Sequence, residues 1–69
     1  MKLVDKKTYR TIVFYFEDEK KQEEYKVTYS ELAYESFGPE WIVEYSYSYD
    51  EVEDEDLMKK LIGLAKQEW

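Results

Sequence analysis

Alternating apolar and polar residues predict three β-strands along this chain. The first, residues 8–17, is rich in β-branched and aromatic residues and is apolar on both faces, which favours a central position in a sheet. The second, residues 24–28, follows a polar run at residues 18–22 that predicts a hairpin loop. The third, residues 41–49, alternates almost strictly, which is typical of a strand with one wet face. Its aromatic face would carry Trp41, Val43, Tyr45, Tyr47 and Tyr49.

The apolar spacing changes to three and four in residues 53–67, which predicts an amphipathic helix. Acidic residues at its start and Lys66 near its end match the helix dipole. We expect Gly63 to allow close approach of this helix to the sheet. A shorter helix is predicted over residues 29–37, because Thr28 and Glu31 have the spacing of a capping box.

Together these elements predict one α+β domain over residues 1–69, with the order ββαβα. It would be a three-stranded antiparallel sheet with the C-terminal helix packed on one face and the short helix between strands 2 and 3. A chain of 69 residues can bury only a thin core. The pattern leaves open which sheet face the helix covers, and whether the tyrosines of the third strand are core or interface.

The composition excludes several kinds of chemistry. The chain has no His and no Cys, so catalytic triads, thiol chemistry, zinc sites and disulfides are ruled out. The acidic run at residues 50–56 lacks the calcium-loop pattern, since Val52 replaces a ligand and no Gly follows. A domain this thin rarely builds a catalytic cleft. We therefore expect no enzyme activity, no catalytic residue, no metal and no cofactor.

The apolar runs are too short for a signal peptide or a membrane span, so we expect a cytoplasmic protein that does not bind membranes. Its net charge of -7 is concentrated in residues 27–58, which contain ten acidic residues and no basic one. Such a stretch repels nucleic acid and attracts basic surfaces, which predicts a basic nucleic-acid-binding protein as partner and no direct nucleic-acid binding. The candidate phosphate surrogates are Glu31, Glu35, Glu40, Glu44, Asp50, Glu51, Glu53, Asp54, Glu55 and Asp56, and the candidate aromatic anchors are Tyr34, Trp41 and Tyr47.

In size and in its balance of acidic and aromatic residues, the chain resembles small phage-encoded inhibitors that mimic DNA. These include anti-restriction proteins, uracil-DNA glycosylase inhibitors and anti-CRISPR proteins. The resemblance rests on composition and predicted layout, with no shared motif, so it assigns no residue. It implies a non-enzymatic inhibitor that occupies the nucleic-acid channel of a host nuclease or CRISPR-type effector. The alternative is an assembly module that uses its Tyr-rich sheet face or the edge strand at residues 41–49, as a monomer or a homodimer.

Overall fold

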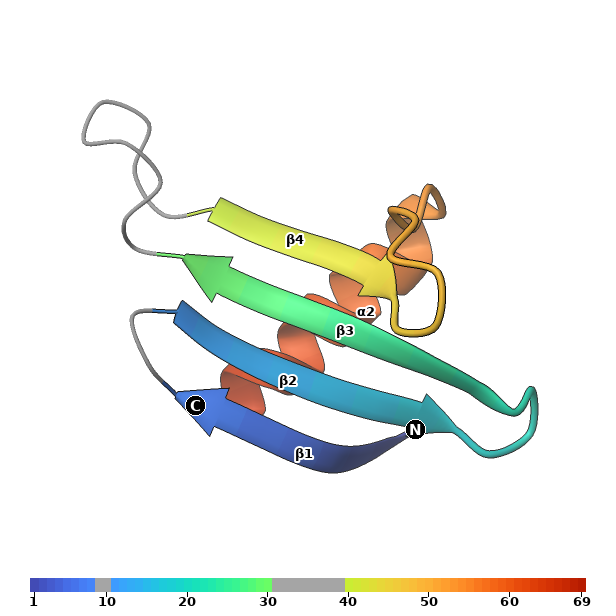
Figure 1. Ribbon diagram of the computed structural model, residues 1–69, viewed down its shortest axis with the longest axis horizontal. Coiled ribbons are helices and arrows are strands. Elements are labelled where there is room, and N and C mark those ends of the chain that lie inside the picture. The colour runs from blue at the N-terminus through green and yellow to red at the C-terminus, as the bar shows by residue number, and fades with distance from the viewer. Residues whose placement is uncertain (9–10, 31–39) are drawn as a thin grey trace.

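A four-stranded antiparallel sheet, with a helix crossing behind it, forms the part of the chain that the computed structural model describes, residues 1–8, 11–30 and 40–69 (Figure 1). The strands lie side by side in the order β1-β2-β3-β4, and each pairs antiparallel with the next. The elements are β1 (Lys2–Thr8), β2 (Thr11–Asp18), β3 (Glu23–Ser30), β4 (Glu40–Tyr45) and α2 (Glu55–Gln67).

The predicted three-stranded sheet is wrong, because a further strand, β1, pairs with β2 at one edge. Its side chains are exposed except for Leu3, which is half-buried, so β1 carries almost no apolar alternation. The pairing register shifts between Leu3 and Asp5, which is a β-bulge. Lysines at an exposed edge discourage pairing with other chains. Edge strands of this kind are held by the backbone ladder and leave little trace in hydropathy.

The short helix predicted over residues 29–37 is also wrong where it can be compared. Tyr29 and Ser30 belong to β3, and Thr28 pairs with Val13 on one side and Ile42 on the other. Residues 31–37 lie outside the described residues. The capping-box spacing at Thr28 is a local signal, and two neighbouring strands override it by pairing with the same backbone.

The third predicted strand ends four residues early. Strand β4 stops at Tyr45, residues 46–48 form a turn, and Tyr49 adopts a positive φ of 61°. Tyr47 and Tyr49 are therefore exposed and do not continue the aromatic face under the helix. The alternating pattern continues in the sequence, but the chain turns back along the outer edge of β4 instead.

Other predictions are confirmed. The hairpin loop joins β2 to β3, and the Asp18 carboxylate accepts hydrogen bonds from the amides of Lys20 (3.1 Å) and Lys21 (3.3 Å). Gln22 takes a positive φ of 54°, the conformation that glycine usually supplies in such turns. The α2 helix is present, and β2 has the predicted central position.

Helix α2 covers the sheet face that carries Phe14 and Val27, and packs Leu61 and Ala65 against it. In the described part of the chain no helix covers the other face (Figure 1). The Tyr25 hydroxyl, on the covered face, donates a 2.6 Å hydrogen bond to Glu23. Burial is the larger cause, and the Glu23 carboxylate the smaller, of a pKa of Tyr25 that lies well above its usual value. The buried core comprises Phe14, Phe16, Tyr25, Val27, Val43, Val52, Leu61 and Ala65.

Asp54 caps the N-terminus of α2 by accepting hydrogen bonds from the amides of Asp56 (3.0 Å) and Leu57 (3.2 Å). Lys66 in the last turn suits the negative end of the helix dipole. Gly63, however, is exposed, and a Cβ built on it would meet no atom within 4 Å. The expectation that Gly63 permits close helix–sheet contact is therefore wrong, since it faces away from the sheet.

Replacing Leu61 by Ala should lower the free energy of unfolding by about 2–5 kcal/mol, because a fully buried side chain would leave a cavity. The exposed Lys59→Ala change in the same helix is the control and should cost less than about 0.5 kcal/mol. Urea unfolding followed by circular dichroism measures both. Equal stability of the two variants would contradict the assigned packing of α2.

Gly63→Ala should raise the free energy of unfolding by about 0.5–1 kcal/mol, because Ala favours the helical backbone and nothing crowds its methyl group. The same unfolding experiment measures the gain. A destabilised variant would show that the glycine is needed for a close contact after all.

Candidate protein-interaction surface

Residues 46–56, hereafter the acidic segment, connect β4 to the first turn of α2 and contain six of the 17 acidic residues of the chain. The segment contains no basic residue. All of its carboxylate side chains are exposed to solvent. They belong to Asp50, Glu51, Glu53, Asp54, Glu55 and Asp56.

Val52 and a short backbone ladder hold the acidic segment in place. Val52 is only 2% exposed and belongs to the hydrophobic core. Its amide donates to the Val43 carbonyl (2.9 Å), and the Tyr45 amide donates to the Asp50 carbonyl (2.9 Å). The backbone of Glu51 forms an isolated antiparallel β-bridge with that of Glu44. The segment thus covers part of the free edge of β4, and its carboxylates are presented on a fixed backbone.

Two exposed tyrosines accompany these carboxylates. Tyr47 is 72% exposed and Tyr49 is 65% exposed, although large aromatic side chains are usually well buried. The ring of Tyr47 lies 5.9 Å from that of Tyr45, centroid to centroid. The Lys26 ammonium lies 5.3 Å from the centre of the Tyr49 ring. This end of the molecule therefore combines exposed aromatic rings, which are enriched at protein interfaces, with anions that attract basic surfaces.

The structure brings together only part of the set of residues predicted from the sequence. The six carboxylates of the acidic segment and Tyr47 lie in one continuous segment. Glu40 and Trp41 lie at the opposite end of β4, since five steps along the strand separate Glu40 from Tyr45 by about 17 Å. Glu31, Tyr34 and Glu35 lie outside the described residues.

Two of the predicted phosphate surrogates have local partners within the domain. Glu44 is half-buried on the uncovered sheet face and lies opposite Lys26 in the strand register. Asp54 caps α2, although its side chain remains exposed. Trp41, predicted as an aromatic anchor, is half-buried against Tyr29 and Trp69. Alternation placed Trp41 and Glu44 correctly on opposite faces of β4, but it could not reveal these neighbours.

Sequence reasoning missed Tyr49 as an exposed aromatic residue. The alternating pattern placed it on the same face as Val43, and only the turn after Tyr45 moves it away. Glycine or proline would have signalled such a turn, but residues 46–48 contain neither. The paired Ser46 and Ser48 were the available signal, since serine side chains cap turns; the Ser48 hydroxyl accepts from the Asp50 amide at 3.4 Å.

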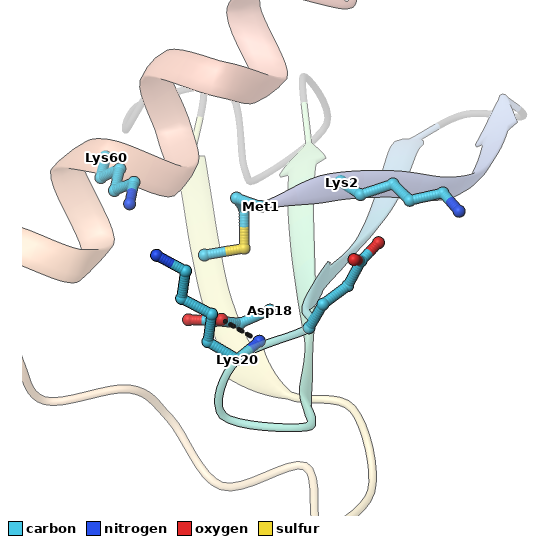
Figure 2. A pocket seen from close by; sticks show the side chains of 6 residues that line it. Met1, Lys2, Asp18, Lys20 and Lys60 are labelled. Atoms are coloured by element: carbon cyan, nitrogen blue, oxygen red, sulfur yellow. Dashed lines mark hydrogen bonds between the residues drawn. The ribbon is translucent and has the colours of Figure 1, made fainter.

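A cavity of about 330 Å³ near the N-terminus has a mixed charge (Figure 2). The side chains of Lys20 and Lys60 point toward each other there, from the β2–β3 turn and from α2. Asp18 and Glu19 supply opposite charge, and Asp18 already accepts the Lys20 amide. The full lining is Met1, Lys2, Asp18, Glu19, Lys20 and Lys60. Apart from half-buried Asp18, these side chains are exposed, so the cavity lacks the buried polar groups that orient a ligand.

The described residues contain no group of three or more Asp or Glu side chains placed to hold a metal ion. Among them, too, no helix is long and apolar enough to cross a membrane. Comparison of the chain with protein-family models, with curated proteins and with solved structures gave no match.

Val52→Ala should loosen the acidic segment and lower the free energy of unfolding by about 1–3 kcal/mol, because it removes buried methyl groups. Hydrogen exchange should accelerate most at the amides of Tyr45 and Val52, which pair the segment with β4. Val4→Ala is the matched control, since Val4 is 42% exposed. Unchanged exchange at Tyr45 in Val52→Ala would contradict the anchoring role of Val52.

Proposed function

We propose that the protein is a non-enzymatic inhibitor or interaction protein that presents its acidic segment to the basic nucleic-acid channel of a host nuclease, glycosylase or CRISPR-type effector. The observation that supports this function is the set of six exposed carboxylates on a backbone anchored by Val52. A flexible acidic tail would lose conformational entropy on binding, whereas an anchored segment loses much less.

Electrostatics favours this kind of partner. Channels that bind a phosphate backbone are lined with Lys and Arg, and they attract any surface of concentrated negative charge. All six carboxylates of the acidic segment fall within residues 50–56, so the segment concentrates its negative charge over a short stretch of chain, as a phosphate backbone does. Each exposed ion pair contributes only about 0.2–1 kcal/mol, so the number of simultaneous pairs decides the affinity.

The exposed tyrosines supply what charge alone lacks. Aromatic rings dominate the energetics of many protein interfaces, because they bury a large apolar area with few rotatable bonds. Tyr47 and Tyr49 flank the start of the carboxylate run and can pack against apolar surface beside a basic channel. The mechanism is steric and electrostatic competition with nucleic acid, without turnover.

A second candidate is an assembly module, and one observation favours it. The sheet face opposite α2 has Val13, Tyr15 and Ile42 half-exposed, with no helix over them in the described part of the chain. This face differs from the Tyr-rich face predicted for assembly, which α2 covers. Sedimentation separates the two candidates, because an apolar self-association is insensitive to salt whereas binding through carboxylates weakens as salt rises.

The charge-reversal variant Glu53→Lys/Glu55→Lys tests the leading proposal. The wild-type protein should inhibit DNA processing by at least one of a uracil-DNA glycosylase, a restriction endonuclease and a CRISPR effector nuclease. The variant should be about tenfold weaker or more, since two attractive contacts become repulsive. Both side chains are exposed, and the capping residue Asp54 is unchanged, so the fold should persist.

The control is Glu40→Lys/Glu68→Lys, which makes the same change in net charge at exposed positions outside the acidic segment. Its inhibitory potency should stay within about twofold of the wild type. Absence of inhibition across the three enzymes at low salt would contradict the proposal. Equal loss in the two variants would contradict the assignment of the surface, since net charge alone would then explain the effect.

A further inference from the structure

A second surface feature lies at the other end of β4 from the acidic segment. Tyr29 near the end of β3, Trp41 near the start of β4, and Lys66 and Trp69 at the C-terminal end of α2 line a cavity of about 320 Å³. Three segments that are far apart in sequence thus contribute to one concave surface. That volume is at the lower end of the range for small-molecule sites.

The walls of this cavity are aromatic and in mutual contact. The ring centroids of Tyr29 and Trp41 are 4.8 Å apart, and those of Tyr29 and Trp69 are 4.7 Å apart in an edge-to-face arrangement. Trp41 and Trp69 are separated by 6.1 Å. Trp69 remains 54% exposed, so its ring offers free surface to a ligand.

The backbone that carries Trp69 is tied to the sheet edge. The Lys6 ammonium donates hydrogen bonds to the main-chain oxygens of Glu68 (2.9 Å) and Trp69 (3.3 Å). The Glu68 amide in turn donates to the Leu64 and Ala65 carbonyls, which closes the end of α2. The exposed indole is therefore held beside Trp41 by contacts other than its own apolar burial.

Of the described residues that line this cavity, Lys66 is the one with a cationic side chain. The Lys66 ammonium lies 5.8 Å from the centre of the Trp41 ring, and the Lys66 side chain is exposed. An apolar wall with a single cation at its edge complements a molecule with a flat apolar body and one negative charge. We propose that this cavity binds a small aromatic monocarboxylate, with its ring against Trp41 and Trp69 and its carboxylate on Lys66.

Two other classes of ligand fit less well. A quaternary ammonium needs space between aromatic faces, whereas these rings already touch one another and Lys66 repels a second cation. A multiply charged anion such as a nucleotide would approach Glu40 and Glu68, which are exposed and adjoin Trp41 and Trp69 in the chain. A single negative charge needs one cationic partner, which Lys66 supplies.

The chain contains its own reporter for this site. It has two tryptophans, and both line the cavity. Indole emission therefore monitors the proposed site, when excitation is chosen to avoid the tyrosines. The inference is independent of the function proposed for the acidic segment, because it uses different residues and a direct binding readout.

The test is titration of the protein with 3-phenylpropionate, with 3-phenylpropan-1-ol and 3-phenylpropylamine as neutral and cationic counterparts. We expect the acid to cause a saturable change in indole emission. The acid should bind more tightly than the alcohol, and the amine should bind most weakly. Lys66→Met should weaken binding of the acid about two- to five-fold, to the level of the alcohol. Trp69→Ala should abolish binding of the acid, with the remaining Trp41 as reporter, while Tyr47→Ala should leave it unchanged.

Three results would overturn the proposal. The first is the absence of a saturable change in indole emission up to about 5 mM acid, a concentration that would largely saturate a site with a dissociation constant of about 1 mM. The second is binding of the amine as tight as that of the acid. The third is unaltered affinity for the acid in Lys66→Met. The last variant replaces one exposed side chain, and circular dichroism verifies that the fold is retained.

Discussion

The burial of Val52 is the constraint on which the shape of the acidic segment depends. The six carboxylates repel one another, so the segment that carries them would extend into water if nothing held its backbone. Val52 is the apolar residue among them, and its burial in the core pulls residues 50–52 against the edge of β4. Asp54, two residues further on, then begins α2 as its N-cap. Val52 thereby fixes residues 50–52 along the strand edge, and Asp54 fixes the start of the helix.

The sheet separates the molecule into regions of different character. Strand β1 at one edge carries Lys2, Lys6 and Lys7, whereas the acidic segment lines the opposite edge along β4. Lys6 completes the C-terminal end of α2, so part of the basic edge serves the fold. The resulting separation of charge would orient the protein as it approaches a basic surface, with the acidic segment leading. Such orientation raises the rate of productive encounters more than it raises affinity.

The elements that the sequence predicts well are those that bury a face in a single period. Strand β2 and helix α2 show this, since the buried Phe14 and Phe16 are two positions apart and the buried Leu61 and Ala65 are four positions apart. Strand β1 buries almost none of its side chains, so the hydropathy pattern does not predict it. Strand β4 ends at Tyr45, Val52 is buried and Tyr47 is exposed, and this outcome depends on tertiary packing that the local alternation does not contain. The cluster of Tyr29, Trp41 and Trp69 also depends on three separate elements meeting, which no local pattern encodes.

A competition experiment tests whether the acidic segment occupies a nucleic-acid channel. The affinity of the protein for a basic nucleic-acid-binding enzyme is measured with and without the DNA substrate of that enzyme, over a range of salt concentrations. We predict that the DNA and the protein exclude one another on the enzyme, and that the affinity of the protein for the enzyme falls steeply as salt rises. Simultaneous binding of DNA and protein, or an affinity indifferent to salt, would show that the acidic segment does not occupy a nucleic-acid channel.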